Sequence, residues 1–201
     1  MIIQKVPSRR AFEEKLTADG FAVTLPHVLW DSYPVRVEAS LAHDDENLYV
    51  AMRAWEPRTD RRAVVFEDEG DVWEDSCLEL FLMPDPARED LYVNCEINLN
   101  GACLFQYGDH DVDNRRPCTV RPEDIVVTST KDWWQLVYTI PYAAYRSVDP
   151  AFTGASGTVV RGNLYRCGDY TRHLSFVALY PIDLPEPGYH EPAFFGELVF
   201  A

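Results

Sequence analysis

Residues 91–101 are Leu-Tyr-Val-Asn-Cys-Glu-Ile-Asn-Leu-Asn-Gly, and along residues 91–99 aliphatic or thiol side chains alternate with other types. Successive side chains of a β-strand point to opposite faces, so this period predicts a strand with one apolar face. The other face carries Tyr92, Asn94, Glu96 and Asn98, with no Lys, Arg or Thr among them. Aromatic, amide and carboxylate groups bond hydroxyl-rich ligands well. We therefore predict that this row lines a polar groove; the competing interpretation is an ordinary solvated strand face.

A second strand is expected just upstream, over residues 77–83, with Trp73 at its loop-to-strand boundary. A tryptophan there is suited to stacking on a ligand ring or to packing between sheets, and both interpretations stay open. Glu79 should share a face with Cys77 and Phe81. Because burying a lone carboxylate is costly, Glu79 is expected either to bind a ligand or to form a salt bridge, with Arg53 or Arg166 as partner.

The same alternation recurs through the rest of the chain. Residues 35–41 and 48–54 alternate on either side of a polar turn, which predicts a β-hairpin. Gly101 suggests a second hairpin between the strands at residues 91–99 and 102–107. Further strands are expected at residues 125–130, 133–140, 158–165, 174–179 and 197–200.

These elements predict an all-β fold, a single antiparallel β-sandwich of the jelly-roll or immunoglobulin-like kind with minor short helices. The helices are expected at residues 8–16 and in a single turn after Pro141. Residues 1–201 are interpreted as one domain, in which residues 1–29 form an N-terminal arm or the first strands. Long connections are expected near residues 56–72, 108–124 and 180–196.

Composition narrows the class of partner. The chain has 201 residues, 47% of them hydrophobic, which is enough to bury a core. A formal net charge of −15 argues against nucleic acid and anionic membranes, because both attract clustered Lys and Arg. The five cysteines include no CxxC pair, and no apolar run at the N-terminus has the length of a signal peptide. We therefore expect reduced thiols in a cytoplasmic protein.

Several motifs, in order, carry a family resemblance that extends from about residue 30 to the end of the chain. They are Asn47-Leu48-Tyr49-Val50, residues 73–81, residues 92–101, residues 162–169 and residues 189–198. In these motifs the chain resembles the family-9 carbohydrate-binding modules, whose fold is shared by a wider group of cytochrome-like (DOMON-like) sandwich domains. The resemblance implies a β-sandwich that holds a sugar between two aromatic rings, while carboxylate, amide and basic side chains bond its hydroxyls.

The resemblance also implies roles for individual residues. Trp73 would be one clamp ring and Glu79 a hydroxyl acceptor, with facing positions among Asn94, Glu96 and Asn98. Asn163 would come from the C-terminal motif, where Arg166 is suited to bidentate bonding. The second ring departs from the family pattern, because Ser175-Phe176 stands where relatives often have Ser-Trp. Tyr165, Phe176 or Tyr189 is expected to replace it.

The favoured function is therefore non-catalytic binding of a mono- or oligosaccharide, as a small sugar or a glycan end, on a face that includes Tyr92. One alternative is a glycan-active enzyme that uses Glu79 and Glu96 as its carboxylate pair. Another is a haem-binding sandwich domain, which needs a Met or His axial ligand; Met52 and Met83 are predicted to be core residues instead. No cofactor is expected, although the acidic loops at residues 44–46 and 67–71 leave a structural calcium open.

Overall fold

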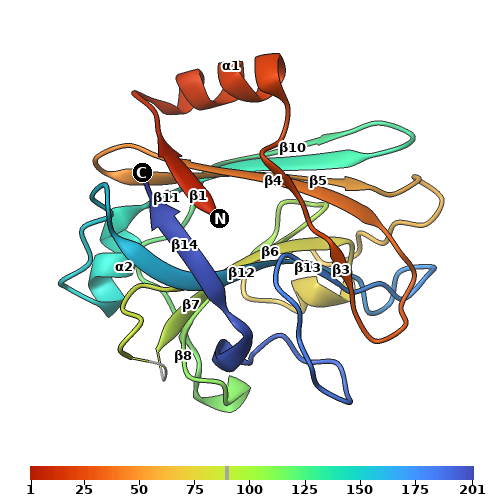
Figure 1. Ribbon diagram of the computed structural model, residues 1–201. Coiled ribbons are helices and arrows are strands. Elements are labelled where there is room, and N and C mark those ends of the chain that lie inside the picture. Colours follow the sequence, from red (N-terminus) through yellow and green to blue (C-terminus); the bar gives the residue numbers. More distant parts are fainter. Residues whose placement is uncertain (89–90) are drawn as a thin grey trace.

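Two layers of β-strands face each other and enclose the main core (Figure 1). The computed structural model describes residues 1–88 and 91–201. One layer pairs, in order, β10 (Glu123–Ser129), β11 (Trp134–Pro141), β5 (Asn47–Trp55), β4 (Arg36–His43) and β2 (Val23–Thr24). The other pairs, in order, β14 (Gly196–Phe200), β12 (Val159–Cys167), β6 (Cys77–Met83), β7 (Tyr92–Asn98), β8 (Cys103–Gly108) and β9 (Arg116–Pro117). Two short strands extend this second layer beside β12, namely β13 (Val177–Ala178) and β3 (His27–Val28).

The first strand, β1 (Ile2–Lys5), joins the two layers into one curled sheet. Ile2 and Ile3 pair with β14, whereas Gln4 and Lys5 pair with β4, and both pairings are parallel. The mostly β fold confirms the expected class, but the sheet is mixed rather than purely antiparallel. The difference arises because a strand at the chain's start pairs with one at its end, a long-range contact that leaves no local sequence signal.

The two predicted hairpins are present, as β4–β5 and β7–β8. The strand expected at residues 174–179 is reduced to β13. The carbonyl of Phe176 still continues the β3–β13 register by accepting from the backbone N–H of Leu29, but the carbonyl of Ser175 accepts from the Arg166 guanidinium. At Ser175 a side chain thus takes the place of a neighbouring strand as the hydrogen-bond partner.

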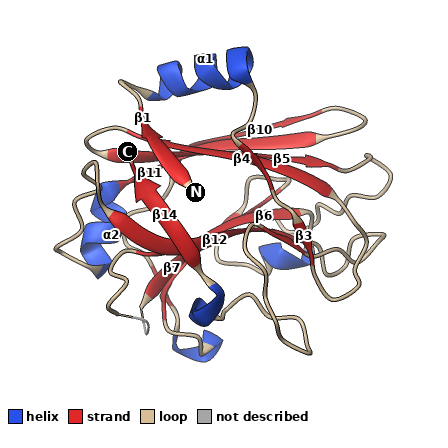
Figure 2. Cartoon of the chain, in the orientation of Figure 1, coloured by secondary structure: helices blue, strands red, loops and turns tan. Residues whose placement is uncertain are grey.

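Helices lie at the margins of the strand layers (Figure 2). The helix expected at residues 8–16 is α1 (Arg9–Asp19), which begins with Ser8 as its N-cap and packs Phe12 onto the outer face of the first layer. The turn after Pro141 is α2 (Tyr142–Val148). Short 3₁₀ turns occur at Val72–Glu74, Val112–Asn114 and Pro192–Phe194, all within the expected long connections or at their ends. Within the described residues, no helix has the length and apolarity needed to cross a membrane.

Both faces of β6 and β7 are buried. Toward the first layer, residues such as Leu80 and Ile97 enter the main core. On the outer face, residues such as Phe81 and Tyr92 enter a second cluster, together with Phe176 and other residues of the long connections. The row predicted to be polar is therefore covered by loops rather than solvated. All five cysteines are buried and unpaired.

The main core can be tested by shortening one β6 side chain. Leu80 is 1% exposed, so Leu80→Ala should lower the free energy of unfolding by about 2–5 kcal/mol through lost burial and a new cavity. Leu174→Ala deletes the same atoms from a side chain that is 49% exposed, and should change it by less than about 0.5 kcal/mol. Urea unfolding measures both; equal effects would contradict the proposed core.

Candidate functional site

A cavity of about 310 Å³ lies on the outer face of the second layer, beneath the long connections. Its floor comes from adjacent strands, with Glu79 on β6, Asn94 and Glu96 on β7, and Cys167 at the end of β12. Strand register explains this grouping, because Glu79 is the direct cross-strand partner of Glu96. Directly opposed residues of neighbouring strands project from the same face of the sheet. Four of the residues predicted from the sequence thus meet at one cavity: Trp73, Glu79, Asn94 and Glu96.

A hydrogen-bond network holds the β7 side of the floor. The Asn94 amide nitrogen donates to Glu96 Oε1 at 2.7 Å, and its amide oxygen accepts from the Arg115 guanidinium at 2.7 and 3.0 Å. Arg115 also donates to the backbone carbonyls of Tyr92 and Asp109, and its guanidinium lies 4.1 Å from the centroid of the Tyr92 ring. Arg115 therefore fixes the orientation of the Asn94 amide, whose nitrogen points to Glu96.

Glu79 has a buried carboxyl oxygen without a hydrogen-bond partner. The residue is 1% exposed, and Oε1 has no hydrogen-bond partner in the structure. Burial raises the pKa of Glu79 well above its usual range, and the nearby carboxyl groups of Glu96 and Asp169 raise it further. Glu79 lines the cavity, and a carboxyl group that keeps an unpartnered oxygen is a ready acceptor or donor for a bound polar group.

Burial also raises the pKa of Glu96, to about 7, against the opposing effects of Asn94 and Arg115. His190 lies 3.9 Å from Glu96 Oε1 through Nε2, but burial, with help from Arg115, lowers the pKa of this imidazole to about 3. His190 is thus neutral near pH 7 and forms no ion pair with Glu96. Its Nδ1 lies 2.7 Å from the Tyr92 hydroxyl, which links His190 to β7 beneath the cavity wall.

Aromatic side chains form the walls. Trp73 lies on the 3₁₀ turn before β6 and is half-buried. Trp30, Phe176 and Tyr189 also line the cavity, and their rings contact one another. The Trp30 ring lies 5.3 Å from Phe176 and 5.8 Å from Tyr189, centroid to centroid. Phe176 and Tyr189, both named from the sequence as replacements for a second clamp ring, thus line the cavity with Trp73.

Trp30 was not anticipated from the sequence. Its indole N–H donates to the carbonyl of Leu184 at 2.9 Å, so the ring is tied to the C-terminal connection. Trp30 and Asp31 have φ angles of 52° and 51°, a left-handed conformation that is uncommon for residues with side chains. Local strain of this kind tends to accumulate near functional sites.

The other predicted site residues support the cavity without lining it. Asn98 donates to Asp75 and to the carbonyl of Val65, and so fastens the loop that carries Trp73. Asn163 bonds both backbone groups of Tyr180. Tyr92 lies under the cavity wall, against His190 and Arg115.

Tyr165 and Arg166 do not line the cavity but hold the wall residue Tyr189 in place. The Tyr165 ring stacks on Tyr189 at 4.0 Å, and the Tyr189 hydroxyl donates to the carbonyl of Arg166. The Arg166 guanidinium forms a buried ion pair with Glu56, which also accepts from the indole of Trp134. The salt bridge considered for Glu79 is thus formed by a different carboxylate, and Arg53 bonds Gln135 instead.

Arg115 and Asp169 also line the cavity and were missed in the sequence. Both lie outside the central strand region, so no periodic pattern connects them with Glu79. Among residues 1–88 and 91–201, no group of three or more His, Cys, Asp or Glu side chains is arranged to hold a metal ion. Met52 and Met83, considered as haem ligands, are fully buried in separate apolar clusters, as expected for core residues.

The chain belongs to carbohydrate-binding family 9, whose model matches residues 13–200. A “putative carbohydrate-binding protein” from Bacteroides uniformis has a similar structure, with a TM-score of 0.82 and 29% identity over 100% of this chain and 98% of that one. Two family-9 module structures from Caldicellulosiruptor kristjanssonii share the fold. The glucose complex has a TM-score of 0.73 at 12% identity, and the cellotriose complex has 0.68 at 14%. Both cover 100% of this chain, and this chain covers 95% and 93% of theirs. No curated protein matches the sequence.

The raised pKa of Glu96 predicts a pH-dependent stability. A carboxyl group whose pKa is higher in the folded state favours folding below its unfolded pKa, and that contribution is lost as the pH rises through the folded value. Between pH 4.5 and about 7, wild type should therefore lose roughly 3 kcal/mol of unfolding free energy relative to Glu96→Gln. Gln retains an acceptor for Asn94. Urea unfolding across this range, with the exposed Glu14→Gln as control, measures the difference; parallel curves for wild type and Glu96→Gln would contradict the assignment.

Proposed function

We propose that this protein is a non-catalytic carbohydrate-binding protein that holds a small sugar or the end of a glycan in the cavity between Glu79 and the aromatic walls. The observation that carries the proposal is the unpartnered Oε1 of Glu79, on a cavity floor that faces aromatic rings. Sugars present both kinds of surface, because their hydroxyls bond polar groups and their C–H faces stack on aromatic rings.

The aromatic and polar residues of the cavity make different contacts with the proposed sugar. Trp73 contacts one face of the pyranose ring, and Phe176 with Tyr189 or Trp30 contacts the ligand from the other wall. Glu79 and Glu96 bond hydroxyl groups from the floor, and Gln106 adds an amide at the margin. The volume of about 310 Å³ is at the low end for ligand cavities, which favours one sugar unit over a long segment of chain.

Family membership supports this assignment, and related modules have been crystallised with glucose and with cellotriose. Those ligands share a glucose unit and differ in length, which matches a site that accepts a chain end. We extend the carbohydrate specificity of those modules to this chain as part of the proposal, with glucose as the first probe.

Replacing the ring of Trp73 should remove binding. Titration of wild type with glucose, cellobiose and cellotriose should give a saturable change in tryptophan fluorescence. Trp73→Ala should weaken the affinity about tenfold or more, since the loss of a stacked aromatic anchor commonly costs more than 1.4 kcal/mol. Trp55→Ala is the matched control, because Trp55 lies on β5 of the first layer and is 37% exposed. No response to any sugar, or equal affinities in both variants, would refute the proposal.

An enzyme that uses Glu79 and Glu96 is the second candidate, favoured by their juxtaposition and by the raised pKa of each. Glycosidase carboxyl groups flank the scissile bond. Here both groups rise from one floor as cross-strand partners, an arrangement better suited to binding one side of a sugar. The assay is release of p-nitrophenol from p-nitrophenyl glycosides. We expect none above background, whereas release by wild type that is abolished in Glu79→Gln would favour the enzyme.

A further inference from the structure

Carboxyl groups outnumber basic groups in the cavity lining. Three carboxyl groups contribute, from Glu79, Glu96 and Asp169, against a single guanidinium, that of Arg115. The imidazole of His190 is neutral near pH 7, because burial lowers its pKa to about 3. The three carboxyl groups therefore lack enough positive partners within the lining, and a bound cation would supply one.

The two arginine side chains near the cavity floor, Arg115 and Arg166, already have hydrogen-bond or ion-pair partners in the protein. Arg115 donates to Asn94 and to the carbonyls of Tyr92 and Asp109, from the β7 side of the cavity. Arg166 forms its ion pair with Glu56 and donates to the carbonyl of Ser175. Oε1 of Glu79 remains without a partner, on a residue that is 1% exposed.

Two carboxyl groups opposed across neighbouring strands repel each other when both are ionised. Protonation relieves this repulsion, and so does a positive charge placed between the two groups, which a neutral hydroxyl does not supply. An ammonium group donates up to three hydrogen bonds and supplies the missing positive charge, and hydrogen bonds between ionised partners are the stronger kind. The cavity floor is thus complementary to a ligand that carries a protonated amine.

We propose that the preferred ligand is an amino sugar, whose protonated primary amine lies between Glu79 and Glu96 while its ring contacts the aromatic walls. This inference rests on the proposed carbohydrate function and specifies its ligand class. A metal cation is a poorer match, because no group of three potential ligands among the described residues is arranged to hold one. The aromatic walls and the Gln106 amide suit the ring and hydroxyls that accompany the amine.

The electrostatics of the cavity agree with this inference. Burial and neighbouring carboxyl groups raise the pKa of Glu79 well above its usual range, and burial raises the pKa of Glu96 to about 7. A bound ammonium favours the ionised carboxyl groups, so its binding should release protons near pH 6.5. The other titratable groups that act on this pair are Glu69, Cys77, Tyr92, Cys95, Arg115, Tyr165, Arg166, Cys167, Asp169, Tyr189 and His190.

The test is isothermal titration calorimetry at pH 6.5 with sugars that differ by one amine. The probes are D-glucosamine, 3-amino-3-deoxy-D-glucose and 6-amino-6-deoxy-D-glucose, compared with D-glucose and with N-acetyl-D-glucosamine, in which acetylation removes the charge. At least one amino sugar should bind wild type about tenfold or more tightly than glucose, as expected for a charge-assisted hydrogen bond. Repeating the titration in buffers with different ionisation enthalpies should show proton release for that ligand and none for glucose.

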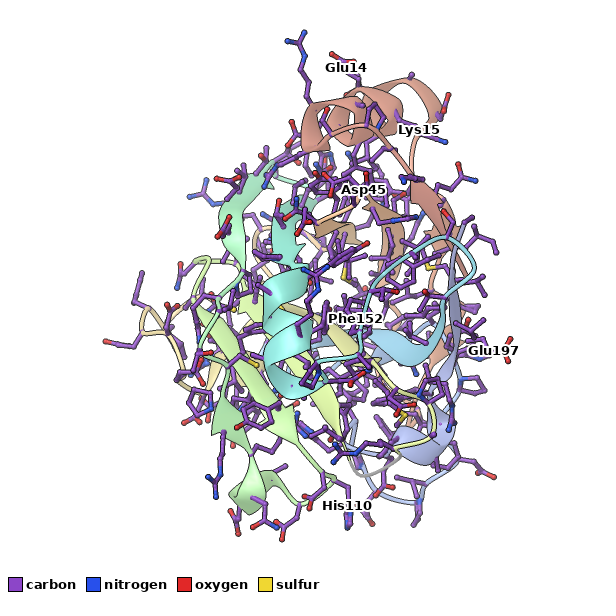
Figure 3. All side chains as sticks on the ribbon, turned by 90° about the vertical axis from the view of Figure 1, so that its left-hand side faces the viewer. Glu14, Lys15, Asp45, His110, Phe152 and Glu197 are labelled. Atoms are coloured by element: carbon purple, nitrogen blue, oxygen red, sulfur yellow. The ribbon has the colours of Figure 1, made fainter. Side chains whose placement is uncertain are left out.

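Variants of the two carboxyl groups test whether they cause the preference for an amino sugar over glucose. Glu79→Gln and Glu96→Gln should each reduce it severalfold while leaving glucose affinity less affected. Glu14→Gln is the matched control, since it removes the same charge from α1, on the first layer. In Figure 3, Glu14 lies at the opposite end of the molecule from His110, whose loop precedes the cavity residues Val112 and Arg115.

The outcomes separate the two proposals. If glucose binds in the cavity and no amino sugar binds more tightly, the amino-sugar inference is overturned and the carbohydrate function stands. If no sugar binds at all, both are overturned. A preference in wild type that persists unchanged in both Gln variants would place the amine elsewhere and overturn the inference as well.

Discussion

The register between β6 and β7 is the constraint on which the site depends. Both strands are buried on both faces, so Leu80 and Ile97 fill the main core while Glu79 and Glu96 face the cavity. A shift of one residue would exchange those faces, placing carboxyl groups in the core and leucines in the cavity. The apolar alternation thus secures the core and places the two carboxyl groups at the cavity at the same time. Because the packing of about half of each strand enforces the register, the two carboxyl groups are held together despite their mutual repulsion.

The cavity also depends on polar residues that never reach its surface. Asn98 and Asp75 fasten the loop that carries Trp73, and the loop's backbone N–H groups at Val64 and Val65 donate to Asp75. On the opposite side, Arg166 pairs with Glu56 of the first layer and accepts the Tyr189 hydroxyl at its carbonyl. Removing one partner of a buried ion pair is strongly destabilising. Substitutions at Arg166 should therefore affect the fold and the aromatic wall together, and binding data at this position need a stability measurement beside them.

The period-two pattern was sufficient to predict β6, β7 and the shared outer face of Glu79, Cys77 and Phe81, because one strand face must meet a core. It was not sufficient to separate Asn94, which lines the cavity, from Asn98, since both are polar and lie on the same face. Which of them meets a cavity is decided by the loops above, and loop conformation is not periodic. For the same reason Trp30 and Arg115 were missed. The parallel pairings of β1 with β4 and with β14 were missed because both join residues far apart in the sequence, and the pairing with β14 joins the two ends of the chain.

The most direct test of the account is a crystal structure of the protein grown with glucose. The account predicts a pyranose in the cavity, with its ring against Trp73 and a hydroxyl within hydrogen-bond distance of Glu79 Oε1. Glucose bound on another surface, or a cavity without sugar at saturating glucose, would contradict it.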